Sequence, residues 1–128
     1  MTSAVLDASA VLALIRDEPG GNKVAEYVGR AAMSAVNLQE VVKELLVSGL
    51  DETVIRELLG ELRLEVRPHD ADAAYAAAAL HEQTREFGRG LGDRSCMALA
   101  LALKVPAITA DREWRKVKVK GLKLEQLR

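Results

Sequence analysis

Short apolar runs alternate along this chain with longer segments whose apolar residues recur at helical spacing. The runs predict strands at residues 4–6, 31–35, 64–66, 106–109 and 122–124. The longer segments predict helices over residues 8–16, 23–30, 51–62, 70–87 and 94–103, with a further helix starting at residue 37. Strands that alternate with helices in one chain predict an α/β fold, here a parallel sheet of about five strands with helices on both faces.

Composition limits the size and setting of this fold. The chain has 128 residues and is 49% hydrophobic, which is enough for one continuous core, so we expect a single domain over residues 1–128. Cys96 is the only cysteine, and no secretion leader is recognisable. The longest apolar run, residues 96–103, is far shorter than the roughly 20 residues of a membrane span. We therefore expect a cytoplasmic protein that does not enter a membrane.

Four acidic residues stand where a predicted strand stops or a helix begins: Asp7, Glu40, Asp93 and Asp111. Each alone is explained as a helix cap, and Asn37 with Glu40 three residues later has the form of a capping box. As a set they suggest more, because the carboxyl ends of parallel strands collect along one edge of the sheet, where ligands bind. We expect the four carboxylates to meet there.

A cluster of carboxylates is costly unless a positive charge occupies it, since like charges raise one another's pKa. Mg²⁺ and Mn²⁺ prefer oxygen ligands, and His69 and His81 are too few and too dispersed for a zinc set. Such an ion can activate a water and neutralise charge on phosphate oxygens. The residues thus favour hydrolysis of a phosphodiester.

The motifs around these acids resemble those of PIN-domain ribonucleases, most closely the VapC-type toxin halves of VapBC toxin–antitoxin pairs. The matching segments are VLDASA at residues 5–10, NLQEV at 37–41, GDRSCMALA at 92–100 and TADREW at 109–114. They occur in the family's order and span nearly the full length of the chain.

This resemblance implies a PIN-like fold and a Mg²⁺- or Mn²⁺-dependent endoribonuclease that acts on single-stranded or looped RNA. It also implies an antitoxin partner, and we expect a homodimer. By position, the ligands of the metal, direct or through water, would be Asp7, Glu40, Asp93 and Asp111. Ser9 would hydrogen-bond a ligand or a phosphate, and direct contact between Asp111 and metal is left open.

Two other functions remain possible at this level. A receiver-like phospho-acceptor module has a similar length, a parallel sheet and an acidic Mg²⁺ pocket, but it needs adjacent acids near the first strand, and Asp7 has no acidic neighbour. A catalytically inactive PIN scaffold would serve only as a binding partner for another protein.

Three further patterns carry open interpretations. Seven Lys or Arg and two Glu lie within residues 112–128, which predicts either a guide for an RNA backbone or the solvated face of an edge strand, given the alternation at Val117 and Val119. The apolar stripe of residues 54–62 is predicted to be core, or, where exposed, a groove for a partner helix or a second copy. Trp114 is predicted to be buried, and His69-Asp70 to be a helix cap.

Overall fold

Five parallel strands form the centre of the molecule in the computed structural model, which describes residues 1–128. The strands are β1 (Ala4–Leu6), β2 (Ala31–Ser34), β3 (Glu65–Arg67), β4 (Ala107–Thr109) and β5 (Leu124–Gln126). Their order across the sheet is β3-β2-β1-β4-β5, and every neighbouring pair is parallel. The predicted α/β class and the number of strands are confirmed.

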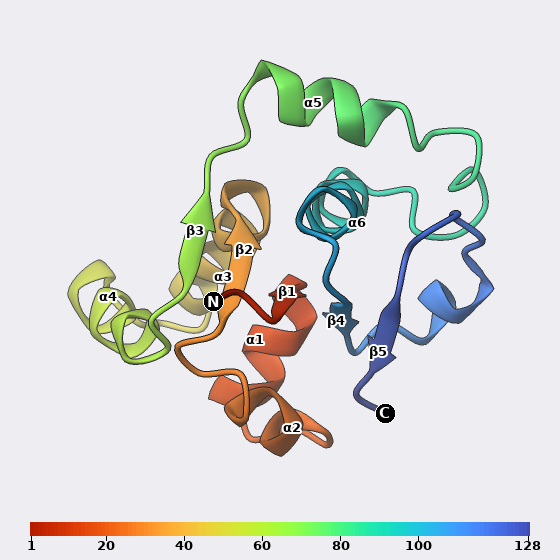
Figure 1. Cartoon of the computed structure of the whole chain (residues 1–128). Coiled ribbons are helices and arrows are strands. Elements are labelled where there is room, and N and C mark those ends of the chain that lie inside the picture. Colours follow the sequence, from red (N-terminus) through yellow and green to blue (C-terminus); the bar gives the residue numbers. More distant parts are fainter.

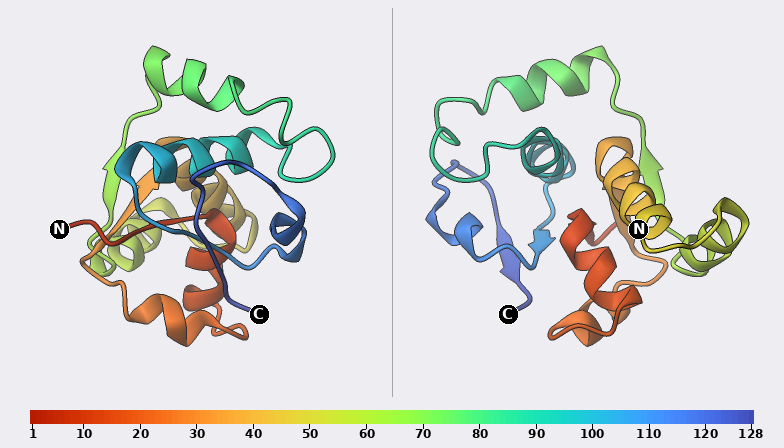
Figure 2. Two further views of the ribbon diagram at one scale, coloured as in Figure 1. Left: turned by 45° about the vertical axis from the view of Figure 1, so that its right-hand side comes forward. Right: turned by 180° about the vertical axis from the view of Figure 1, so that it is seen from behind.

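Helices cover both faces of this sheet, as predicted (Figures 1 and 2). They are α1 (Ala8–Ile15), α2 (Gly21–Ala25), α3 (Ala35–Val47), α4 (Glu52–Glu61), α5 (Ala71–Ala78) and α6 (Leu91–Leu103), with a 3-10 helix, η1 (Arg112–Lys116). No helix combines the length and the apolar composition that a bilayer crossing requires.

Alternation along the strands divides the core into two clusters. Leu6 of β1 packs with residues of α1, α2, α3 and α4, whereas its neighbour Val5 packs with residues of α5, α6 and η1. Successive side chains of a strand point to opposite faces, so a strand buried on both sides contributes to both clusters. This burial explains why β1 reads as an uninterrupted apolar run.

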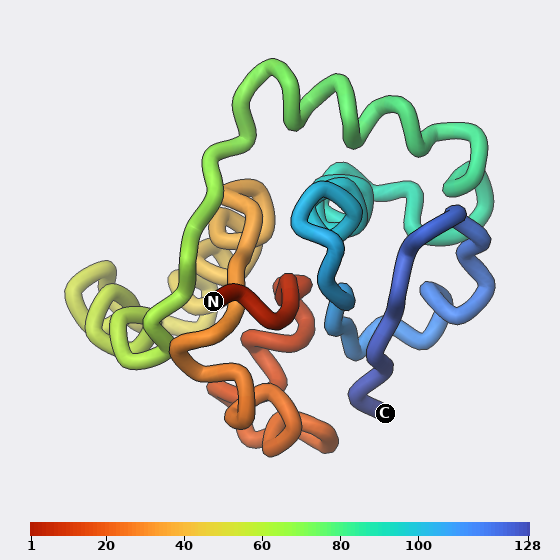
Figure 3. The backbone as a smooth tube through the Cα atoms, in the orientation of Figure 1, coloured from red at the N-terminus to blue at the C-terminus, as the bar shows by residue number.

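The path of the chain places a ligand-binding position at β1. The chain starts in the central strand, β1, and moves outward through β2 to β3. The connection that contains α5 and α6 then returns it to β4 and β5 on the other side of β1 (Figure 3). The strand order therefore reverses next to β1. In parallel α/β sheets, ligands bind outside the carboxyl ends of the strands at such a reversal, and Asp7 is the first residue after β1.

Two helix starts differ from the sequence prediction. Ser34, and not Asn37, caps α3, because its hydroxyl accepts the N–H of Val36 at 3.2 Å. The helix α6 starts at Leu91 after Gly90, so Asp93 lies within its first turn and accepts the Gly90 N–H at 3.2 Å. Asn37 and Asp93, predicted from the sequence to precede their helices as caps, therefore both lie inside the first turn.

Other boundaries also moved. The helix predicted over residues 70–87 ends at Ala78, and the Thr84 hydroxyl, which bonds the Leu80 carbonyl and accepts from Arg94 Nε, shapes the connection that follows. The last strand covers residues 124–126 and not 122–124. These three residues pair with Ala107–Thr109 of β4, and the Leu127 N–H donates to the Thr109 carbonyl. Residues 117–120 form no strand, so the edge-strand interpretation of the basic segment is wrong.

Two expectations about single residues are confirmed. Trp114 is completely buried, and Asp70 caps α5 by accepting the N–H of Ala73 at 2.9 Å. The receiver alternative is excluded by topology, because receiver modules have the order 2-1-3-4-5, which differs from the order seen in this sheet.

Candidate active site

Asp7 lies at the floor of the site, between β1 and β4. Its backbone N–H donates to the Ile108 carbonyl at 2.9 Å, and its side chain is nearly buried, with 6% of the residue exposed. The hydroxyls of Ser9 and Thr109 both donate to Asp7 Oδ2, at 2.7 and 3.0 Å. Two short hydroxyl contacts to the same oxygen hold this carboxylate in one orientation.

Burial makes the charge on Asp7 costly. Burial is the main cause that raises the pKa of the Asp7 carboxyl to about 6; the nearby Asp93 and Glu40 carboxylates add to the rise, and the hydrogen bonds from Ser9 and Thr109 oppose it. A carboxylate in this state is stabilised by any cation placed beside it.

Glu40 projects from α3 towards the start of α6. The side-chain amide of Asn37 donates to Glu40 Oε1 at 2.8 Å and to the Gly92 carbonyl at 3.0 Å, so it ties the two helices together. Asn37 is fully buried, and its own Oδ1 has no hydrogen-bond partner. A Cβ on Gly92 would overlap the Glu40 carboxylate. Glycine at this position therefore leaves the space that Glu40 occupies.

Asp93 lies in the first turn of α6, where the amino end of the helix favours a negative charge. Partial burial nevertheless raises the pKa of its carboxyl, and the Asp111 carboxylate adds to this effect, while the Gly90 N–H opposes it. The buried indole Nε1 of Trp114 is close enough to lower the pKa of Asp93, yet it has no partner in full hydrogen-bond geometry. The indole and the Asp93 carboxyl are thus near each other without forming a hydrogen bond.

Asp111 follows β4 and caps η1. Its Oδ1 accepts the Glu113 N–H at 2.9 Å, its own N–H donates to the Thr109 hydroxyl at 3.0 Å, and its carbonyl accepts from Gln126 Nε2 at 3.0 Å. These bonds fix the backbone at Asp111. One of its carboxylate oxygens is committed to the cap, which leaves the other for a ligand.

The fold brings all four predicted acids to one end of the sheet. Asp93 and Glu40 both act on the pKa of Asp7, and Asp111 acts on the pKa of Asp93. The buried thiol of Cys96 lies beneath them, and burial, followed by Asp7, Asp93 and Glu40, raises its pKa well above the usual range. Cys96 is thus an uncharged core residue.

The donor set fits a hard divalent cation in its chemistry. The four acids offer only oxygen ligands, and neighbouring carboxylates raise the pKa of Asp7 and of Asp93, an effect that a cation between them would reverse. No three His, Cys, Asp or Glu side chains lie close enough together to hold an ion by themselves. This spacing suits an ion that keeps several of its waters, as Mg²⁺ does, and reaches some carboxylates through them.

Three residues of this site were missed as functional by sequence reasoning. Thr109 stands two residues before Asp111 at the end of a strand, and it links Asp7, Ser9 and Asp111 through its hydroxyl. Asn37 and Gly92 looked like a cap and a loop residue. A polar residue closing an apolar strand could have pointed to Thr109, but no local signal marks the contact of Asn37 with Gly92, which are 55 residues apart.

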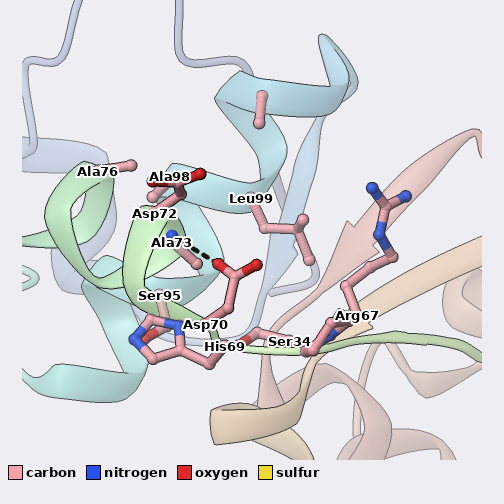
Figure 4. A pocket seen from close by; sticks show the side chains of 12 residues that line it. Ser34, Arg67, His69, Asp70, Asp72, Ala73, Ala76, Ser95, Ala98 and Leu99 are labelled. Carbon is pink, nitrogen blue, oxygen red and sulfur yellow. Dashed lines mark hydrogen bonds between the residues drawn. The ribbon is translucent and has the colours of Figure 1, made fainter.

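Two of the hollows outside the acidic site are large. One, of about 410 Å³, lies among β3, α5 and α6 and is lined by Arg67, His69, Asp70 and Ser95, among others (Figure 4). None of the four acids lines it. The other is a groove of about 560 Å³ between α3, α4 and β3, which includes Ile55 and Leu59 of the apolar stripe. The stripe is therefore partly core and partly groove wall.

Comparison with known proteins supplies independent information about the fold. A sequence model described as the PIN domain matches residues 4–120. Similar solved structures include a toxin–antitoxin complex from Klebsiella pneumoniae (TM-score 0.76, 16% identity, 98% of both chains). Others are a DNA-bound VapBC from Salmonella typhimurium (0.74, 19%, 100% of both) and VapBC-1 from nontypeable Haemophilus influenzae (0.71, 21%, 98% of both). No curated protein matches the chain.

Proposed function

The chain belongs to the PIN-domain family, and from that premise we propose that it is a Mg²⁺- or Mn²⁺-dependent endoribonuclease, the VapC-type toxin of a toxin–antitoxin pair. One observation carries the proposal. Four carboxylates from separate elements gather at the point where the strand order reverses, and burial, with a smaller contribution from the neighbouring carboxylates, raises the pKa of Asp7 and Asp93. A parallel sheet binds its ligands at this place.

Asp7, Glu40 and Asp93 would hold the cation, and Asp111 would do so directly or through water. When bound, Mg²⁺ or Mn²⁺ lowers the pKa of a water and neutralises charge on the phosphate. The protein contributes rigid positions for the donors, since Ser9 and Thr109 fix Asp7 and Asn37 fixes Glu40. The Ser9 hydroxyl also accepts the Ala110 N–H at 2.9 Å, so it is held in place beside the first aspartate.

A protein antitoxin is the proposed partner. The similar structures from Salmonella, Klebsiella and Haemophilus are all toxin–antitoxin assemblies. A small upstream reading frame that encodes a DNA-binding protein and overlaps this gene would support the pairing. Copurification of its product with this chain would test it directly.

Cleavage of a fluorogenic single-stranded RNA tests the activity. We expect cleavage with Mn²⁺ or Mg²⁺, none with EDTA, and a loss of at least about a hundredfold for Asp7→Asn or Asp93→Asn, which remove a ligand but keep the shape of the side chain. Asp51→Asn is the matched control. Asp51 is an exposed cap of α4 whose role asparagine also fills, so this variant should keep full activity.

Full activity in both site variants would refute the assignment. The remaining alternative, an inactive PIN scaffold, has its own signature. It would show no cleavage of any RNA and no Mn²⁺ binding by calorimetry, although all four acids are present.

A further inference from the structure

Five cations line the two segments that flank the acidic site. They are Arg89 on the connection into α6, Arg112, Arg115 and Lys116 on η1, and Lys118 just after it. We name this set the basic rim. All five residues are exposed, and none takes part in any of the salt bridges of the molecule. No carboxylate of the chain is therefore paired with them, although Lys116 and Lys118 line a hollow together with Glu82 and Glu86.

The basic rim has no explanation as protection of a sheet edge. Lysines often guard an exposed edge strand, but residues 112–120 form a 3-10 helix and irregular chain, not a strand. General solubility does not explain it either, because the whole chain has a formal net charge of −1, whereas residues 112–128 hold seven Lys or Arg against two Glu. Exposed cations that lie close together create a local positive potential, which attracts a negatively charged partner.

The basic rim is held at a fixed position relative to the four acids. It begins at Arg112, directly after Asp111, and Trp114 anchors η1 in the core next to Asp93. Lys116 Nζ lies 4.8 Å from the centre of the Phe87 ring. This contact joins η1 to the connection before α6, so the cations of both segments belong to one face beside the site.

A negatively charged substrate needs attraction from outside the acidic centre. The carboxylates of the site repel a phosphate chain, and a divalent ion neutralises only part of that charge. Lys and Arg contacts to phosphates supply most of the sequence-independent affinity for nucleic acids. Trp114 on η1 is completely buried, which leaves Phe87 as the one aromatic residue of these segments with exposed surface, too little for a platform on which several bases stack. Attraction to the backbone is thus the main contribution available here.

We propose that the basic rim binds the phosphate backbone of single-stranded RNA and leads it to the acidic site. The proposal rests on the ribonuclease function proposed above. It assigns RNA affinity to Arg89, Arg112, Arg115, Lys116 and Lys118, and the cleavage step to the acids. Substitution of the rim should therefore change the binding of RNA and leave the chemical step unaltered.

The test uses the full chain with the triple substitution Arg112→Gln, Arg115→Gln and Lys118→Gln. Binding of a short fluorescent single-stranded RNA is measured by anisotropy in EDTA, where no cleavage occurs, over a range of salt concentrations. Each lost phosphate contact should reduce the slope of log Kd against log salt by about 0.7, so the slope should fall by about 2. Affinity at 0.1 M salt should fall roughly a hundredfold, with the difference vanishing near 1 M.

The matched control is Lys43→Gln with Lys104→Gln, two exposed cations outside the rim, on α3 and at the end of α6, which should leave the slope unchanged. In cleavage assays the triple variant should show a raised KM and the same kcat. An unchanged slope would overturn the proposal, and so would equal, rim-dependent affinity for duplex DNA. Rim-dependent RNA binding without any cleavage would instead contradict the ribonuclease function alone.

Discussion

At the scale of single residues, the site is built at the expense of stability. Asp7 is buried among apolar strands, and its only direct compensation is a pair of hydroxyl hydrogen bonds from Ser9 and Thr109. Burial still dominates and raises the pKa of Asp7 to about 6. An aspartate that served only as a cap would gain stability by staying at the surface. Asp7 is thus destabilising until a ligand arrives.

The pH dependence of stability should reveal this cost. In the folded state the pKa of Asp7 is about 6, against 3.8 for an aspartate exposed to water. Because the folded state binds the proton more tightly, the free energy of unfolding should fall as pH rises from about 4 to about 6, by about 3 kcal/mol. In EDTA at pH 7.5, Asp7→Asn should therefore have a higher Tm than the natural chain, with no difference at pH 4.

Asp51→Asn provides the comparison in the same thermal unfolding series. Its exposed carboxylate caps α4, and its replacement should leave the Tm unchanged at either pH. Addition of Mn²⁺ should stabilise the natural chain and not Asp7→Asn. A Tm for Asp7→Asn that never exceeds that of the natural chain would show that burial of Asp7 carries no net cost.

Asn37 should act as a positioning residue. Asn37→Ala removes the donor that holds Glu40 and leaves the Gly92 carbonyl unpaired, which should cost about 1–3 kcal/mol of stability. Loss of an outer hydrogen bond to a ligand typically weakens metal binding about 10–100-fold. Titration with Mn²⁺ by calorimetry would measure this change, and the exposed Asn22→Ala is the control. Unaltered Mn²⁺ affinity would make Asn37 purely structural.

At the scale of secondary structure elements, the first turn of α6 packs closely against Glu40 and Asn37 of α3. Gly92 lies where the Glu40 side chain of α3 must pass, and a methyl group there would overlap the carboxylate. The short side chain of Asn37 bridges the same two helices. The packing of α3 against α6 therefore sets the position of Glu40 and Asp93 together.

Two glycine substitutions separate this packing from helix propensity. Gly92→Ala should displace Glu40, since the obstructed atoms are the end of a flexible side chain, and so reduce RNA cleavage while α6 remains folded. Gly60→Ala in α4 meets no atom within 4 Å, so it should raise stability by about 1 kcal/mol and leave cleavage unchanged. Circular dichroism with a cleavage assay measures both. Equal activity in the two variants would contradict the account.

The boundaries of the elements were less predictable than their existence. Asn37 and Glu40 have the spacing of a capping box, yet Ser34, three residues earlier, caps α3. Asn37 and Glu40 face α6 instead, because the Asn37 amide donates to the Glu40 carboxylate and to the Gly92 carbonyl. Local patterns identify residues able to cap a helix. They do not show which of two capable residues caps the helix and which one makes a tertiary contact instead.

At the scale of the whole molecule, the crossing of the chain from β3 to β4 decides where the site lies. Strands β2 and β3 lie on one side of β1, and β4 and β5 on the other (Figure 1). The acids at positions 7 and 111 thus come from adjacent strands, although 104 residues separate them in sequence. The connections that follow β1 and β4 therefore lead in different directions, which leaves the ends of these two strands accessible to a ligand.

The homodimer stays a prediction at this scale. Val47, Tyr75 and Leu91 are large apolar residues that the isolated chain leaves mostly exposed, and such residues often lie at contacts between chains. Light scattering after size exclusion should give twice the chain mass of 13.9 kDa. A monomer mass at every concentration tested would rule it out.

The sequence alone determined the class of fold and the candidate acids. Both follow from local physics, because buried strands require uninterrupted apolar runs, amphipathic helices require helical spacing, and ionisable residues at the ends of apolar runs stand out. The family resemblance then assigned this set, Asp7, Glu40, Asp93 and Asp111, as the ligands of a metal ion.

Only the tertiary structure decided how these acids are held and what surrounds them. The Thr109 bond to Asp7, the Asn37 bridge to α6 and the exposed basic rim each depend on residues far apart in the chain. Such contacts have no local signature, because their free energy comes from burial and from charge proximity that exist only after the sheet has formed.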